Sequence, residues 1–135
     1  MNNHSITLHG PSDFESMKKA GQLASDVLDY LTPFVEPKVT TGFLNDLAHE
    51  YIVSKGAIPA PLNYKGFPKS TCISVNHVVC HGIPGDKKLN SGDILNIDVT
   101  VILGGWYGDT SRMFFAGKPP IKAKRLCDIT YQCLM

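Results

Sequence analysis

The segment from Ile94 to Phe115 places the strongest constraint on how this 135-residue chain can fold. In its first half, apolar residues alternate with more polar ones, as in a strand that buries one face. The apolar positions are Leu95, Ile97, Val99, Val101 and Leu103, and the opposite face carries Ile94, Asn96, Asp98, Thr100 and Ile102. A second run, rich in aromatic residues, follows Gly104-Gly105. Together the two runs predict an antiparallel β-hairpin.

Each of these runs contains an aspartate, Asp98 or Asp109, although aspartate is depleted in strands. A two-residue loop at Leu103-Gly104, or a four-residue loop around it, would place the two carboxylates directly opposite each other. A turn centred on Gly104-Gly105 would make them diagonal neighbours on the same face. Either register brings their Cβ atoms to roughly 5–8 Å. A β-bulge would break this parity.

Two carboxylates this close repel each other, and solvent, a shared proton or a bound cation can relieve the repulsion. Solvation is the simplest explanation for one aspartate on an open face. For two that face each other beside Asn96, Thr110 and Ser111, a cation competes with it. Hard divalent ions prefer carboxylate oxygens, and one bridging carboxylate spans the roughly 3.5–4 Å between the ions of two-metal hydrolases. A proton-sharing pair or a glycosidase-type acid and nucleophile needs similar geometry, so spacing alone leaves these alternatives open.

The rest of the chain predicts helices around a small sheet. A capping box at Ser12 and Glu15 starts a helix that Pro33 stops, with one apolar face formed by Phe14, Met17, Ala20, Gly21, Ala24, Val27, Leu28 and Leu31. A second helix follows Thr40-Thr41 and ends at Gly56. Residues 57–70 read as a loop, 71–76 and 77–82 as short strands, 83–93 as a connection, and 121–135 as a helix. The expected fold class is α+β, with an antiparallel sheet covered on one face by helices.

Composition excludes several classes of protein. The net charge is +1, so no broad electrostatic field attracts nucleic acid or an anionic membrane. The basic cluster Lys118–Arg125 is interpreted as a solvated loop and helix start, with a docking site for an RNA-rich partner as the alternative.

Residues 1–10 lack the apolar core of a signal peptide, and no membrane span is expected, which favours a cytoplasmic protein. The four cysteines match no zinc-finger spacing and are expected to be reduced and mostly buried.

Three motifs carry a family resemblance: "PLNYKGFPKSTCISVNHVVCHGIP", "GDILNIDVTV" and "WYGDTSRMF". In this order they resemble the type I methionine aminopeptidases of the pita-bread metallopeptidase family, and the resemblance runs from the first helix to Met135. It implies the first half of a pita-bread fold, with residues 1–135 as the N-terminal portion of a single catalytic domain that ends within a helix. Such enzymes are nearly twice this length.

The resemblance also implies roles for particular residues. Asp98 would hold one metal ion and Asp109 would bridge two, as the first two of five ligands, while one histidine and two glutamates would come from the second half. His81 matches a histidine that contacts the substrate and assists at the scissile peptide. The residues that match the lining of the methionine pocket are Tyr64, Phe67 and Cys72, and those that match backbone positions for a monovalent cation are Asn76 and Val78.

Simpler interpretations stand beside these roles. Tyr64 and Phe67 could simply pack the loop against the core, and Cys72 could be a packing residue without a chemical role. His77 and His81 have the spacing of a helical zinc pair, but the residues between them favour a strand.

By the same resemblance, the complete enzyme would remove the initiator methionine through water activated by two divalent ions, with manganese, iron, cobalt and zinc as candidates. Its substrates would be peptides and nascent chains with an N-terminal methionine, and the ribosome is one further partner to consider. The alternative is a catalytically incomplete half-domain that acts as a binding or assembly module. A half-fold would expose an apolar surface, which favours self-association.

Overall fold

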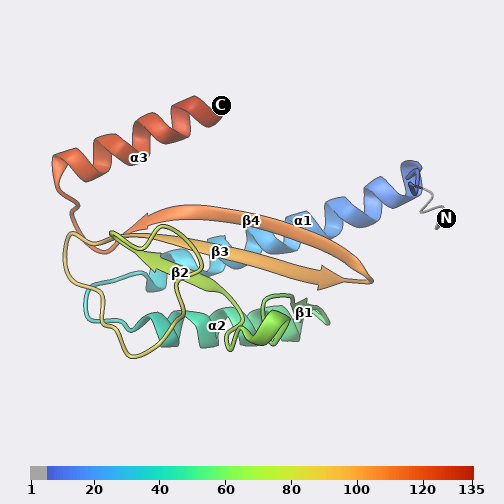
Figure 1. Cartoon of the computed structure of the whole chain (residues 1–135), viewed down its shortest axis with the longest axis horizontal. Coiled ribbons are helices and arrows are strands. Elements are labelled where there is room, and N and C mark those ends of the chain that lie inside the picture. Colours follow the sequence, from blue (N-terminus) through green and yellow to red (C-terminus); the bar gives the residue numbers. More distant parts are fainter. Residues whose placement is uncertain (1–5) are drawn as a thin grey trace.

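The computed structural model describes residues 6–135. Residues 1–5, half of the segment in which no signal peptide is predicted, lie outside the described part. The elements follow in the order α1 (Pro11–Leu31), η1 (Thr32–Phe34), α2 (Thr41–Ser54), β1 (Ile58–Pro59), η2 (Tyr64–Gly66), β2 (Cys72–Val75), β3 (Ile94–Leu103), β4 (Trp106–Phe115) and α3 (Ile121–Leu134). This order confirms the predicted α+β class (Figure 1).

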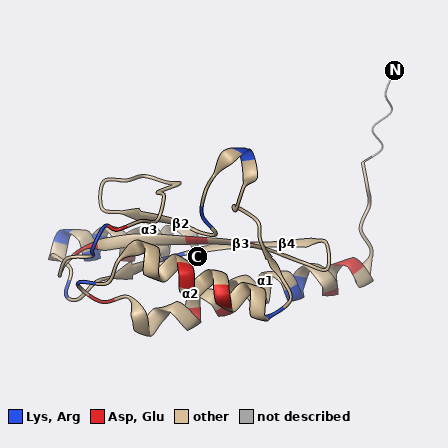
Figure 2. Ribbon diagram, turned by 90° about the horizontal axis from the view of Figure 1, so that it is seen from below, with Lys and Arg blue, Asp and Glu red and all other residues tan. Residues whose placement is uncertain are grey.

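The antiparallel sheet is built around β3. Strand β4 pairs with β3 along its whole length, and the other edge of β3 pairs with β2 near its start and with β1 near its end. The helices α1 and α2 lie on one face of this sheet, while loops stand over the other (Figure 2). The sheet is thus covered by helices on one face, as the sequence predicts.

The predicted apolar face of β3 packs on α1 and forms the centre of the core. Leu95, Ile97, Val99 and Val101 are fully buried, and each such side chain contributes about 1.5–3 kcal/mol on burial. Strand β4 meets α1 at Gly108, where a Cβ would collide with the Ala20 carbonyl. The absence of a side chain at Gly108 therefore lets helix and sheet approach closely.

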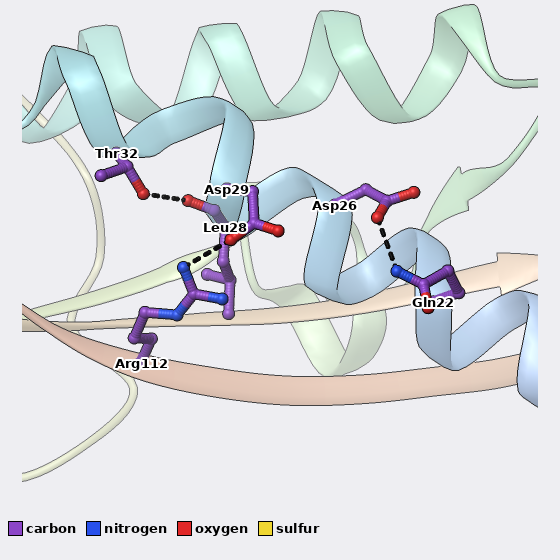
Figure 3. Close-up of polar contacts among 6 residues, drawn as sticks. All are labelled: Gln22, Asp26, Leu28, Asp29, Thr32 and Arg112. Atoms are coloured by element: carbon purple, nitrogen blue, oxygen red, sulfur yellow. Dashed lines mark hydrogen bonds and ion pairs between the residues drawn. The ribbon is translucent and has the colours of Figure 1, made fainter.

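An ion pair also joins α1 to β4 (Figure 3). Arg112 Nη1 donates to Asp29 Oδ1 at 2.7 Å, and both side chains are substantially exposed. Exposed pairs of this kind contribute about 0–1 kcal/mol, so apolar packing dominates the contact between α1 and the sheet.

The first helix begins differently from the prediction. Gly10 is its N-cap and Pro11 its first residue, and the Gly10 N–H donates to the Asp13 carboxylate at 2.9 Å. The predicted capping box at Ser12 and Glu15 is therefore wrong, because Pro11 already starts the helix. The first turns of this helix also extend beyond the sheet, so Phe14 and Met17 are about half exposed instead of buried, and Leu23 takes a core position that the prediction omitted.

The other helices agree with the sequence. Thr40 caps α2 by accepting a hydrogen bond from the Phe43 N–H at 3.1 Å, and Gly56 follows its end with a left-handed φ of 72°. Helix α3 is present, but none of its residues is buried. Within residues 6–135, no helix combines the length and the apolar character that crossing a membrane requires.

The predictions for two segments between α2 and β3 need correction. Residues 57–70 include the short strand β1, whose two residues pair with Val101 and Ile102. Residues 77–82 do not form the predicted strand, because Asn76 and His81 have left-handed φ values of 54° and 53° and the Val78 N–H donates to the Val75 carbonyl in a turn. The β-branched residues between the two bends favour a strand locally, but the bends prevent it.

Candidate active site

The β3–β4 turn determines where the two aspartates lie. Leu103 pairs with Trp106, so the loop is Gly104-Gly105, and both glycines have positive φ as a type I′ turn requires. In this register Asp109 lies opposite Thr100, and Asp98 lies opposite Ser111. Asp98 and Asp109 are therefore diagonal neighbours on one face, with Cβ atoms about 7–8 Å apart or closer. This is the second of the two predicted registers.

The electrostatic environment of Asp98 reflects this arrangement. Its pKa is raised above the ordinary value, first by partial burial and then by the neighbouring carboxylate of Asp109, while His81 acts in the opposite direction. The ionised pair is therefore disfavoured here. A cation or a shared proton would relieve the repulsion, so the site suits a positively charged ligand.

The loop after β2 presents His81 to this face. The Ile73 N–H donates to the Gly82 carbonyl at 2.9 Å, and the Gly82 N–H donates to Ser74 Oγ at 3.1 Å. A Cβ on Gly82 would collide with the Ile73 carbonyl. Gly82 thus lets the loop lie against the free edge of β2, and the left-handed residue before it, His81, projects beside the aspartates.

All six residues predicted for catalysis, substrate binding and metal binding line one cleft of about 960 Å³. They come from the loop before β2, from β2 itself, from the loop after it, and from β3 and β4: Tyr64, Phe67, Cys72, His81, Asp98 and Asp109. The aspartates supply acidic groups, and the loop before β2 supplies the aromatic side chains. The cleft therefore combines an acidic part with an apolar wall.

Cys72 lies between these two parts of the cleft. It pairs directly with Asp98 across β2 and β3. Burial, and after it the nearby charges of Asp98, Cys80 and Asp109, together raise the pKa of its thiol to about 11. At neutral pH Cys72 is therefore an uncharged, weakly polar surface rather than a nucleophile.

The other cysteines differ from the prediction of mostly buried thiols. All four cysteines are free, but Cys80 and Cys133 are exposed and Cys127 is partly exposed. Neither cysteine of α3 is buried, because this helix packs no side chain fully against the rest of the described chain.

The predicted monovalent-cation positions lie outside the lining of the cleft. The Asn76 side chain donates to Asp93 Oδ1 at 2.8 Å and accepts from the Ile94 N–H at 3.1 Å. Because the hypothesis concerns backbone atoms of Asn76 and Val78, it stays a prediction. Among residues 6–135, no group of three His, Cys, Asp or Glu side chains is placed to hold a metal ion, and the metal-binding roles of Asp98 and Asp109 stay predictions.

Some lining residues were missed by the sequence argument. Thr100 and Tyr107 follow from the alternation that places Asp98 and Asp109 on the open face, and both line the cleft. Lys65 also lines it, held in a left-handed conformation with φ 47°, its ammonium 5.4 Å from the centre of the Tyr64 ring. Nothing in the local sequence indicates that position, because it depends on how the loop turns.

Comparisons with known proteins identify the family to which the chain belongs. Residues 15–135 match the model of metallopeptidase family M24. The methionine aminopeptidase of Rickettsia prowazekii is 62% identical over 130 residues, and that of Escherichia coli K12 is 53% identical over 131; each match covers 96% of this chain and 50% of the relative. The crystal structure of the Rickettsia prowazekii protein superposes with a TM-score of 0.93, covering 95% of this chain and 52% of that one. The chain thus spans about half the length of these relatives.

Proposed function

Because the chain belongs to metallopeptidase family M24, we propose that it forms part of a methionine aminopeptidase, which removes the N-terminal methionine of newly made proteins. The observation that supports this most directly is the convergence of Asp98, Asp109 and His81 with an apolar wall in one cleft. Since initiator methionine is removed from chains as they are made, the proposed reaction takes place in the cytoplasm, with the ribosome as a further candidate partner.

The acidic pair fits a divalent metal. Two carboxylates on one face, with the pKa of Asp98 raised by burial and by Asp109, offer the oxygen ligands that hard cations prefer. Manganese, iron, cobalt and zinc are all compatible with a site that also contains a histidine. When bound, two such ions would supply a water of lowered pKa and positive charge for a developing oxyanion. The remaining ligands would come from a region that this chain does not contain.

The protein's own side chains divide the remaining tasks. His81, beside the aspartates, would donate a hydrogen bond to the substrate at the scissile peptide. The side chains of Tyr64 and Phe67, with the thiol of Cys72, would enclose the methionine side chain, and a thioether packs well against aromatic rings. A hydrophobic pocket of this kind discriminates by about 1–3 kcal/mol per methylene, so selectivity for methionine would be incomplete.

Complementation tests this proposal. The chain is mixed with the half of the Rickettsia prowazekii relative that it does not cover, a divalent metal and the peptide Met-Ala-Ser, and released methionine is measured. We expect release from the mixture and none from either part alone. A folded mixture that releases no methionine would instead favour the alternative of a binding or assembly module, which the exposed apolar side chains of α3 support.

The bridging role of Asp109 has its own test. In the complemented enzyme, Asp109→Asn keeps the shape of the side chain but removes its charge, and we expect metal binding measured by calorimetry to be abolished. Asp29→Asn is the matched control, because Asp29 is an exposed aspartate that pairs with Arg112 outside the cleft. Unchanged metal affinity in Asp109→Asn would contradict the bridging role.

A further inference from the structure

A buried polar cluster connects α2 to the loop that forms the apolar wall of the cleft. Asn45 of α2 is 3% exposed, and Ser70 and Thr71 are 2% and 0% exposed. Asn45 Oδ1 accepts three hydrogen bonds, from the Ser70 N–H at 2.9 Å, the Thr71 N–H at 3.1 Å and Thr71 Oγ1 at 3.2 Å. One side-chain oxygen therefore satisfies two consecutive buried backbone donors.

These contacts replace strand pairing at the point where the loop enters β2. Regular pairing with β3 begins only at Cys72. Buried backbone N–H groups need a partner, and an unpaired one is costly. One turn further along α2, His49 Nδ1 lies 2.8 Å from Ser70 Oγ and adds a second link between the helix and the same residue.

The loop between its two attachments is held together by its own hydrogen bonds. At its start, the Ala60 N–H donates to the Thr100 carbonyl at 2.9 Å. Within it, the Asn63 N–H donates to the Phe67 carbonyl at 2.8 Å, and the Phe67 N–H donates to the Tyr64 carbonyl at 2.9 Å. These bonds fix the internal shape of the loop but do not attach it to the rest of the molecule. Its position over the sheet therefore depends on its two ends.

We propose that Asn45 is a positioning residue for the apolar wall of the cleft. By holding Ser70 and Thr71, it sets where Phe67 stands relative to Asp98 and Asp109, and thereby the width of the slot available to an apolar N-terminal side chain. Asn45 does not line the cleft and touches no substrate. The identity of that side chain as methionine rests on the proposed function, whereas the positioning of the loop does not.

Hydrogen exchange of individual amides, followed by NMR on the chain, tests the positioning. Asn45→Leu has a similar size but no acceptor, whereas Asn45→Asp retains the acceptor oxygens. In Asn45→Leu we expect exchange at the Asn63 and Phe67 amides, which do not contact Asn45, to accelerate about tenfold or more, the equivalent of one lost buried hydrogen bond. In Asn45→Asp, which keeps the acceptor but loses the donation to Asp46 Oδ1, we expect a smaller acceleration than in Asn45→Leu.

The control for general destabilisation is Leu28→Ala, which removes core packing from α1, an element distant in sequence from the loop. Exchange is compared at denaturant concentrations where both variants have the same fraction unfolded. Acceleration confined to Ser70 and Thr71, or equal acceleration in Leu28→Ala, would overturn the proposal. If Asn45→Leu does not fold, the same exchange measurement is made on Thr71→Val, which removes only the hydroxyl bond to Asn45. Acceleration at Asn63 and Phe67 would again support the proposal, and its absence there would overturn it.

A second measurement follows the cleft itself. With Cys80, Cys127 and Cys133 replaced by serine, alkylation of Cys72 by iodoacetamide should accelerate more in Asn45→Leu than in Asn45→Asp. In the complemented enzyme, Asn45→Leu should raise KM for Met-Ala-Ser more than it lowers kcat. If complementation gives no activity, the proposed function fails, while the exchange experiment still decides whether Asn45 positions the loop.

Discussion

At the residue scale, Asp93 shows how one buried carboxylate organises the connection that carries His81. Its side chain is 9% exposed and accepts hydrogen bonds from Asn76 Nδ2 and from the Asn90 N–H, both at 2.8 Å. Burial acts to raise the pKa of Asp93, but the hydrogen bonds from Asn90 and Asn76 and the charge of Lys87 act against it, so that the pKa lies below its ordinary value. The ionised form is therefore the one that the fold stabilises.

This shift gives a pH dependence with a definite sign. Because the folded-state pKa is lowered, the contribution of Asp93 is present above the unfolded pKa of about 3.9 and is lost as the pH falls through the folded value. Asp93→Asn should lower the free energy of unfolding at neutral pH by about 1–2 kcal/mol and flatten its fall below about pH 4. Urea titrations across acidic pH measure this, with Asp86→Asn, an exposed site in the same connection, as control. A parallel acid slope in wild type and Asp93→Asn would contradict it.

Gly82 is the second residue on which the placement of His81 depends. A Cβ there would collide with the Ile73 carbonyl, whereas a Cβ on Gly85, in the same connection, meets nothing within 4 Å. Gly82→Ala should therefore lower the free energy of unfolding by about 1–3 kcal/mol, because the loop must move away from β2. Gly85→Ala should change it by less than about 0.5 kcal/mol. Equal effects in urea titrations would show that the loop does not depend on close contact with β2.

At the element scale, the hairpin was the part most accessible from sequence. The alternation in β3 identifies its buried face, and the glycine pair identifies the turn, because no other residue type takes positive φ as readily. The choice between the two registers needed the structure, since Leu103-Gly104 and Gly104-Gly105 both contain a suitable residue. The segment 77–82 was mispredicted because its β-branched residues favour a strand, whereas the left-handed φ values of Asn76 and His81 bend the chain on either side of them.

The turn conformation predicts which substitutions at Gly104 are tolerated. Its φ of 58° is left-handed, a region that asparagine enters readily and β-branched residues do not. Gly104→Asn should leave the free energy of unfolding within about 0.5 kcal/mol of the wild-type value. Gly104→Val should lower it by about 1–2 kcal/mol or more. Cross-strand NOEs between Thr100 and Asp109 should persist in Gly104→Asn, and their loss would mean that the register depends on the glycine itself.

At the scale of the whole molecule, packing is distributed unevenly. Helices α1 and α2 bury apolar residues against the sheet, whereas α3 leaves Ile121, Leu126 and Leu134 mostly exposed. The basic residues near its start are also exposed, and Lys124 pairs with Asp128 at 2.6 Å, which agrees with a solvated helix start. Sequence periodicity could predict that α3 is helical, but not which surface it covers, since periodicity contains no information about partners.

Helix α2 provides a matched comparison for α3, because both have 14 residues and only α2 has buried ones. An isolated helix of this length is marginal in water, so its stability has to come from packing. We therefore expect the α3 amides to exchange much faster with solvent than those of α2 in dilute solution. Their protection should be as low as that of helix ends that fray. Equal protection at low protein concentration would contradict this. If instead α3 becomes protected as the concentration rises, its apolar side chains pack against another copy of the chain, as predicted for an exposed half-fold.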